Sequence, residues 1–264
     1  MILEYKELSD IDLKLHLLSG SPIRVDNLII EPYTLWEIKN YGYSKFMEDL
    51  QWGLITKDDF VNAVKDENKR KILESMQDNL KTFDFYIKIF ADVYFEKLIN
   101  FLSLVFKTDD LGIVDKYKIV INSKHDKKDL KIVTRENFDD IVEVVKLQNY
   151  LEDVNEKGEH QFNPADEETQ KLIEQMQKMR KKVEEIKRKQ NQEDGKPITI
   201  YDVISAITAK NNSINKINVW DLTLYQLYDE YKRLQAIDNY DFSIRAIMAG
   251  AENVELKHWS SKLW

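Results

Sequence analysis

Apolar residues recur every three or four positions over most of the first half of the chain, a spacing that places them on one face of a helix. This spacing predicts helices over residues 43–53, 57–80 and 83–106. The last of these is the most apolar, and we expect its apolar face to lie in the core. That face carries Phe85, Ile89, Val93, Leu98 and Leu102.

A short extended segment precedes these helices. Residues 23–30 lie between two prolines and are rich in aliphatic and β-branched residues, which favours a strand. Thr34 and Glu37 then match the Thr-x-x-Glu capping box, in which each side chain satisfies a backbone N–H at the start of a helix. Gly42 is where this short helix is expected to end.

The pattern changes to β-branched runs over residues 116–122 and 130–134, which flank a polar turn. Two such runs around a turn predict a β-hairpin. Thr134 or Asn137 can cap the helix that follows. The apolar stripe of that helix consists of Phe138, Ile141, Val144, Val145, Gln148 and Leu151.

A highly charged segment over residues 166–192 carries apolar residues at alternating spacings of four and three, the pattern of a coiled-coil seam. The seam covers only about three heptads, so an isolated dimer would be marginal and packing against its own domain or a partner helix is favoured. We predict that this seam binds protein. Its residues are Leu172, Met176, Met179, Val183 and Ile186.

Gly195 and Pro197 interrupt the charged segment and mark a domain boundary. After it, Thr199 starts a helix to residue 209, one helix follows around Trp220 to Leu234, and another covers residues 240–249. The predicted division is a mainly helical domain with a β-hairpin near 116–134 over residues 1–164, a charged amphipathic heptad helix over residues 165–194, and a helical C-terminal module over residues 195–264.

The composition agrees with a mainly α fold. The 264 residues include only 7 Gly and 4 Pro, while 33% are charged, and few turn formers with many Lys and Glu favour long helices. The absence of cysteine excludes disulfides and thiol chemistry and fits a reducing cytoplasm. The first residues lack a secretory signal pattern, and charged side chains interrupt the most apolar stretch, residues 86–106. We therefore expect a cytoplasmic protein without a membrane partner.

The net charge of -8 makes nucleic acid an unfavourable partner, because phosphate binding needs clustered and unopposed Lys and Arg. The basic runs at residues 178–182 and 187–189 are separated by Glu184 and Glu185 and lie on the heptad helix. A solvated helix face explains them better than a phosphate-binding site.

No group of residues in the sequence matches a catalytic, cofactor-binding or metal-binding site. The four histidines are isolated, and the seven glycines never cluster into a phosphate loop. Acid pairs such as Asp139-Asp140 could bind Mg²⁺, but they stand at turns or helix starts, where acids commonly cap helices. Ser260 lies near His258 without the glycines of a nucleophile elbow. We predict a non-enzymatic protein and keep a Mg²⁺-dependent nucleic-acid enzyme as the least favoured alternative.

Aromatic residues are frequent in the C-terminal module and fit either a core or a protein-binding surface, since Trp and Tyr dominate interface hot spots. Trp259 and Trp264 lie near the end of the chain and favour a contact surface. With the heptad seam, the predicted protein-binding residues of this module are Trp220, Tyr228, Trp259 and Trp264.

Three stretches of the sequence resemble the tail assembly chaperones of phages that infect Gram-positive bacteria, which are encoded beside the tape-measure protein. These stretches cover residues 30–42, 132–149 and 220–259, in the same order along the chain. They include Pro32-Tyr33-Thr34-Leu35-Trp36-Glu37, Thr134-Arg135-Glu136-Asn137-Phe138-Asp139 and Trp220-Asp221-Leu222-Thr223-Leu224-Tyr225. None of them carries a chemical signature by itself.

The resemblance implies a helical, non-enzymatic protein that holds the tape-measure protein soluble and recruits tail-tube subunits around it in the host cytoplasm. It also implies departure before the virion is finished, and a frameshifted shorter or longer form. A homo-oligomer is compatible with this picture. The alternative is a structural component of the virion, such as a neck, tail or baseplate protein.

Overall fold

The computed structural model describes residues 3–64, 66–115, 118–122, 131–151, 198–249, 254 and 256–261. The chain divides into two compact units, residues 1–152 together with 207–264, and residues 153–206. Of the second unit, residues 198–206 are described; they contain the start of α10 (Ile200–Lys210). The predicted heptad helix and both predicted domain boundaries lie outside the described residues.

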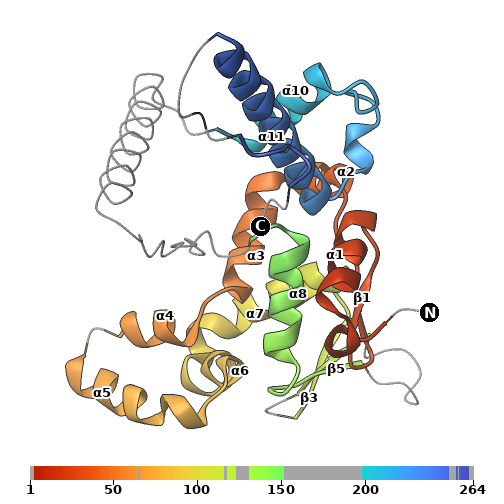
Figure 1. The fold of residues 1–264 in the computed structure, drawn as a ribbon. Helices are drawn as coiled ribbons and strands as arrows, with labels where there is room; N and C mark the ends of the chain where they lie inside the picture. The colour runs from red at the N-terminus through yellow and green to blue at the C-terminus, as the bar shows by residue number, and fades with distance from the viewer. Residues whose placement is uncertain are drawn as a thin grey trace, which may run out of the picture. The chain divides into compact units, whose positions relative to one another are not determined.

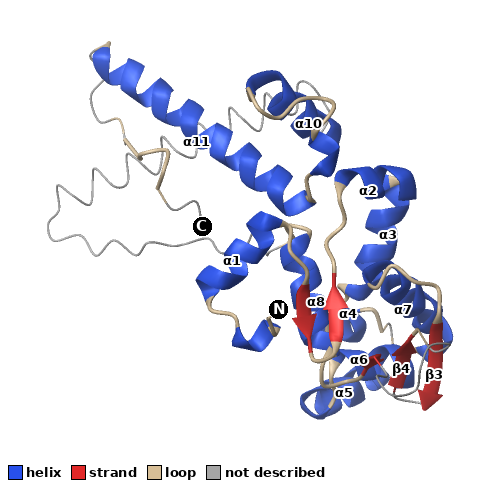
Figure 2. Cartoon of the chain, turned by 90° about the vertical axis from the view of Figure 1, so that its right-hand side faces the viewer, coloured by secondary structure: helices blue, strands red, loops and turns tan. Residues whose placement is uncertain are grey.

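The described chain is mainly helical, as predicted, with a two-stranded and a three-stranded sheet (Figures 1 and 2). It begins with a 3₁₀ turn, η1 (Tyr5–Glu7), and α1 (Asp10–Ser19). Ser9 caps α1 by accepting a hydrogen bond from the N–H of Asp12 at 3.2 Å. Gly20 ends the helix with a φ of +67°, a conformation that glycine adopts without strain.

The segment predicted to be one extended strand is a hairpin of β1 (Ile23–Val25) and β2 (Leu28–Ile30), paired antiparallel. The turn between them places Asp26 at a φ of +52°, which Asp tolerates better than most residues. The N–H of Asp26 donates to Oε1 of Glu4 at 2.7 Å. This contact stabilises a turn that the short run of aliphatic residues did not reveal.

The next two helices end and begin where the sequence predicts. Thr34 and Glu37 form the predicted capping box at the start of α2 (Leu35–Tyr41), and Gly42 ends that helix with a φ of +96°. The following helix, α3 (Tyr43–Gly53), has the predicted bounds. It packs against α7 (Ala91–Val105).

The helix predicted over residues 57–80 is wrong as a single element. It divides into α4 (Lys57–Asn62), α5 (Glu67–Met76) and the 3₁₀ turn η2 (Gln77–Asn79). Asp66 causes the new start, because its Oδ1 accepts hydrogen bonds from the N–H groups of Asn68 and Lys69 at 2.9 and 3.1 Å. Helix α4 buries Phe60 and Val61, whereas α5 buries none of its residues.

The helix predicted over residues 83–106 is also interrupted. Its parts are α6 (Thr82–Asp84), the π-helical turn η3 (Phe85–Ile89) and α7. The N–H of Phe90 donates to the carbonyl oxygen of Phe85, and this wider turn shifts the phase of the helix that follows. As a result the core prediction is right for Phe85, Leu98 and Leu102 but wrong for Val93, which is exposed.

The predicted hairpin near residues 116–134 is confirmed as β4 (Lys118–Ile121) paired antiparallel with β5 (Lys131–Val133). A strand that was not predicted, β3 (Leu111–Asp115), pairs with the other edge of β4, so the sheet order is β3-β4-β5. The sequence hides β3 because it contains Gly112 and its apolar residues Ile113 and Val114 face solvent.

Helix α8 (Phe138–Gln148) follows the sheet, and its predicted stripe is buried except for Leu151, which is half-buried. Of the two residues predicted to cap it, Asn137 occupies the cap position, but its side chain makes no capping hydrogen bond to the helix. Its Oδ1 instead accepts a hydrogen bond from the N–H of Thr134 at 2.8 Å. Its Nδ2 donates to Oδ2 of Asp26 at 2.9 Å, which joins the helix start to the first hairpin.

The two C-terminal helices predicted around residues 220–234 and 240–249 are one helix, α11 (Leu224–Met248). Residues 235–239 contain neither Gly nor Pro, so nothing in them ends a helix, and Asp238 forms an ion pair with Lys210. Trp220 lies before α11 in a 3₁₀ turn, η4 (Val219–Asp221). Among the described residues, no helix combines the length and the apolar character needed to cross a bilayer.

Candidate protein-binding surface

The starts of α2 and α11 meet at their capping residues. Thr34 caps α2 and Thr223 caps α11, and these two threonines form an isolated antiparallel β-bridge. The N–H of Leu35 donates to the carbonyl oxygen of Leu222 at 2.8 Å. The amide of Gln226 donates to the carbonyl oxygen of Leu18 at 2.8 Å and so ties α11 to the end of α1. These contacts fix the positions of the side chains beside the junction of α2 and α11.

Two tryptophans lie beside this junction with a lysine between them. Trp36 of α2 is 52% exposed, and Nζ of Lys39 lies 3.7 Å from the centre of its ring. The same Nζ lies 5.6 Å from the ring centre of Trp220 in η4. The indole N–H of Trp220 donates to the carbonyl oxygen of Lys216 at 3.0 Å, which fixes its orientation. An ammonium over indole faces is a favourable cation–π arrangement.

We call Trp36, Lys39, Ile217 and Trp220 the tryptophan surface. Ile217 stands on the loop that carries Trp220 and is 87% exposed. Of these four residues, only Trp220 is predicted from the sequence as a protein-binding residue. Nothing in the sequence pairs Trp36 with Trp220, because their proximity depends on the contact between Leu35 and Leu222.

Tyr228 lies in a different environment from Trp220. Its ring stacks on that of Tyr150, with 5.5 Å between the ring centres. The ring centre of Tyr150 also lies 5.4 Å from that of Tyr225. Tyr228 is half-buried, and burial raises the pKa of its hydroxyl, with a smaller contribution from Tyr43. The position therefore contributes to packing between α11 and the residues that follow α8.

Trp259 lies in a C-terminal segment that is attached to α11 by Arg233. One guanidinium nitrogen, Nη1, donates to the carbonyl oxygens of Trp259 at 2.6 Å and Ser261 at 3.2 Å. His258 contacts the rings of Tyr240 and Trp259. Trp259 itself is partly exposed. Trp264 and the five residues of the heptad seam lie outside the described residues.

A second exposed apolar feature, not predicted from the sequence, is a stripe on α1 formed by Ile11, Leu15 and Leu18. All three side chains are exposed, and Ile11 is 71% exposed. Their spacings of four and three place them on one face of the helix, while Leu17 is buried on the other side. The spacing itself was visible in the sequence, but it predicts a buried face rather than an exposed one.

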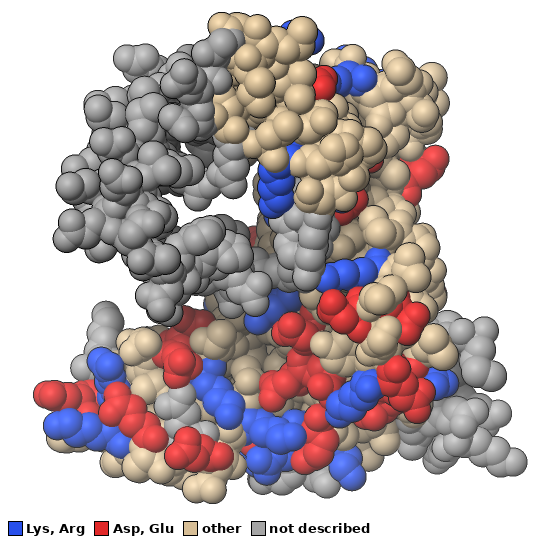
Figure 3. Space-filling model, viewed as in Figure 1, with Lys and Arg blue, Asp and Glu red and all other residues tan. Residues whose placement is uncertain are grey.

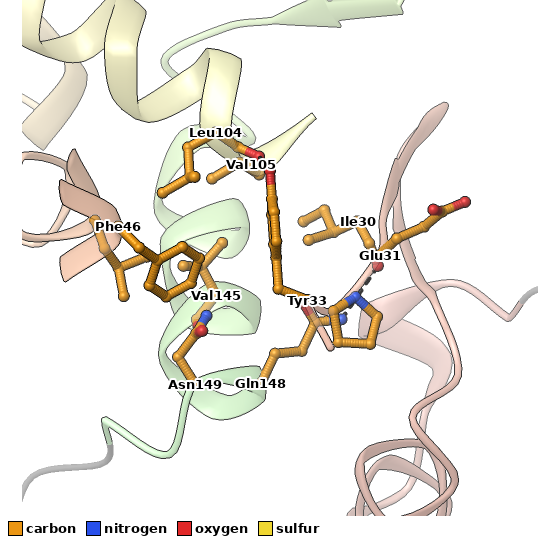
Figure 4. A pocket seen from close by; sticks show the side chains of 11 residues that line it. Ile30, Glu31, Tyr33, Phe46, Leu104, Val105, Val145, Gln148 and Asn149 are labelled. Carbon is orange, nitrogen blue, oxygen red and sulfur yellow. Dashed lines mark hydrogen bonds between the residues drawn. The ribbon is translucent and has the colours of Figure 1, made fainter. Parts of the chain in front are cut away.

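The crevice beside Tyr33 offers little room for a small molecule. Tyr33 fills the crevice between the first hairpin, α7 and α8, donating its hydroxyl to the carbonyl oxygen of Leu104 at 2.8 Å (Figure 4). About 10 Å³ remains there, which is room for about one water molecule. A larger open groove of about 340 Å³ is lined by lysines and carboxylates together, among them Lys57, Lys146 and Glu143.

Charges of both signs are interspersed over the face that carries α4, α5, α6 and α8 (Figure 3). No group of three or more His, Asp and Glu side chains within the described ranges is placed to hold a metal ion. Ser260 Oγ lies 2.7 Å from Nδ1 of His258, but Ser260 also donates its backbone N–H to the same nitrogen at 3.2 Å. This pattern is a local turn on an exposed segment.

The three stretches that carry the resemblance come together in the structure. The amide of Gln148 donates to the carbonyl oxygen of Ile30 at 3.1 Å in a buried hydrogen bond, which joins the middle stretch to the early one (Figure 4). The contact between Leu35 and Leu222 joins the early stretch to the late one. The early stretch therefore contacts both of the others.

Comparison with known proteins gives one match. Residues 187–263 match the family model described as the YomV second domain, which belongs to a phage-type protein family. The match covers less than a third of the chain and includes Trp220, Tyr228 and Trp259. No curated protein and no solved structure matches the chain.

Proposed function

We propose that this chain is a non-catalytic phage tail assembly chaperone that binds the tape-measure and tail-tube proteins in the host cytoplasm. The observation that carries the proposal is the convergence of the three resembling stretches through Gln148, Ile30, Leu35 and Leu222. The similarity of residues 187–263 to a phage-type family supports a phage origin from separate evidence.

The exposed stripe on α1 suits such a partner. A tape-measure protein is a long coiled-coil chain, and an unassembled coiled-coil helix exposes apolar residues at spacings of three and four. Ile11, Leu15 and Leu18 have the spacing of anchors in helix-to-helix recognition. Completing the burial of each side chain would contribute on the order of 1–2 kcal/mol. We propose that a contact limited to these three side chains is released when tube subunits replace the chaperone.

We expect the double substitution Ile11→Asp and Leu15→Asp to abolish most of the solubilising effect on a co-expressed tape-measure protein. Two carboxylates in the stripe would need to be desolvated in the interface, which is costly. The measurement is the soluble fraction of the tape-measure protein on co-expression, with circular dichroism of the purified variant as a check on folding.

The matched control is Ile72→Asp, an exposed isoleucine on α5, 59% exposed, which lies away from α1 (Figure 1). It should leave the soluble fraction unchanged. Equal effects of both variants would reject the stripe as the contact. A tape-measure protein whose solubility does not depend on this chain at all would argue against the chaperone, and stoichiometric recovery of the chain in purified virions would favour a structural component.

A further inference from the structure

The loop that carries Trp220 is built by its own asparagines. Oδ1 of Asn211 accepts hydrogen bonds from the N–H groups of Ser213 and Ile214 at 2.8 and 3.0 Å. Oδ1 of Asn215 accepts one from the N–H of Ile217 at 2.8 Å, and Asn218 donates its amide to the carbonyl oxygen of Ser213 at 2.8 Å. Such turns fix the backbone locally, so the loop has its shape before any partner arrives.

This ordered loop presents Ile217 to solvent, where an isoleucine buries little apolar surface within the fold. Trp36 is exposed beside Trp220 across the junction of α2 and η4. An exposed aliphatic side chain on a fixed loop, together with the half-exposed indole of Trp36, has the composition of an interface anchor. Preorganisation lowers the entropy cost of binding and distinguishes this surface from isolated exposed side chains.

The charge of the surface indicates what its partner carries. No carboxylate among the described residues forms an ion pair with Lys39 or with Lys216, although the chain as a whole has a net charge of -8. Lys39 is held over the indole of Trp36 instead. A carboxylate from a partner could approach this ammonium from the solvent side and keep the cation–π contact in place.

We infer that the tryptophan surface binds an acidic amphipathic helix of a partner protein, whose aliphatic residues contact Trp36 and Ile217 and whose carboxylates pair with Lys39 and Lys216. This assignment rests on the proposed function, in which the partner is a protein. Single-stranded nucleic acid also stacks on aromatic side chains, but it needs a groove of several cations along its backbone. Two lysines and no arginine make the acidic helix the better fit.

The test uses three probes against the full chain. One is a 20-residue helical peptide with a leucine seam flanked by glutamates, the second has lysines in place of those glutamates, and the third is a thymidine decamer. Indole N–H resonances in a ¹⁵N-labelled sample, assigned by single Trp→Phe variants, report binding at Trp36 and Trp220. We expect both resonances to shift with the acidic peptide and to stay in place with the other two probes.

Lys39→Glu should weaken binding of the acidic peptide by about tenfold and strengthen binding of the basic one, because it reverses the charge at the centre of the surface. The matched control is Lys45→Glu. Lys45 is likewise exposed, and its Nζ lies 5.1 Å from the ring centre of Tyr41, so it is also a lysine over an aromatic ring. That control should leave both affinities unchanged. Trp36→Ala should also weaken binding of the acidic peptide, although it leaves the charge of the surface unchanged.

Three results would overturn the inference: no peptide binds, both peptides bind equally to the wild type and to Lys39→Glu, or only the oligonucleotide shifts the two indoles. Each of these can occur while the chain still solubilises a tape-measure protein through α1. Conversely, selective binding of the acidic peptide can hold in a protein that is not a tail chaperone. The two proposals therefore fail separately.

Discussion

Asp84→Ala is expected to lower the free energy of unfolding by about 3 kcal/mol, since removing one member of a buried ionic cluster leaves the others uncompensated. The Asp84 side chain is 1% exposed. Its Oδ1 lies 2.6 Å from Nζ of Lys88, and its Oδ2 lies 3.2 Å from Nη2 of Arg135 and accepts a hydrogen bond from the N–H of Lys81 at 3.0 Å. Lys88 and Arg135 are about a third exposed, so water partly solvates their charges when Asp84 is removed. We therefore expect a loss at the lower end of the range for breaking a buried ion pair.

Urea denaturation followed by circular dichroism measures this loss. Glu136→Gln is the matched control, because Glu136 also lies near Arg135, at 3.7 Å, but is largely exposed. We expect a change of about 0.5 kcal/mol or less for that variant. A loss for Asp84→Ala no larger than that of the control would show that the cluster contributes little to stability.

The same carboxylate makes stability depend on pH. Burial alone would raise the pKa of Asp84, but hydrogen bonds from Lys88 and from the N–H of Lys81, together with the charges of Lys88 and Arg135, hold this pKa below its ordinary value. A group with a lowered pKa in the folded state stabilises fully above its unfolded pKa of about 4 and loses that contribution as the pH falls further. Wild type should therefore lose more stability than Asp84→Ala between pH 5 and pH 3, both values chosen to bracket the unfolded pKa of about 4.

Local signals in the sequence predicted local structure well. The Thr34 and Glu37 capping box, the stop at Gly42 and the bounds of α3 each depend on a few adjacent residues, and each is found in the structure. The pairing of β4 with β5 was predictable for the same reason, since two β-branched runs lie only a few residues apart in the sequence.

The rotational phase of interrupted helices and the contacts between distant segments could not be predicted from such local signals. A count of apolar spacings assumes one continuous helix, so the π-helical turn at Phe85 and the cap at Asp66 went unnoticed and Val93 was placed on the wrong side. The candidate surface illustrates the same limit. Composition indicated Trp220, but Trp36 and Lys39 join it only because the backbone of Leu35 contacts that of Leu222.

Gly53 shows how one residue can satisfy a local and a distant requirement together. The helix predicted over residues 43–53 has Gly53 as its last residue, and so does α3. In the structure, however, a Cβ at this position would lie 2.2 Å from Cε2 of Phe101 on α7. Phe101 is fully buried, so its ring has little freedom to move away. The glycine allows α3 and α7 to approach each other.

Gly53→Ala is therefore expected to destabilise the protein by about 2–3 kcal/mol through overpacking. In an exposed helix the same change would stabilise by about 1 kcal/mol, so the sign of the measured change separates the two explanations. Phe101→Leu alone should also destabilise, because it leaves part of the ring's space empty.

The double variant Gly53→Ala with Phe101→Leu should be more stable than the sum of the two single changes predicts, since the methyl group would occupy space that the ring had filled. Thermal or urea unfolding of the four proteins gives the coupling energy, which we expect to be about 1–2 kcal/mol in favour of the double variant. Strict additivity would mean that Gly53→Ala acts through the backbone of α3 alone, and the close packing of α3 on α7 would then have to tolerate a side chain at this position.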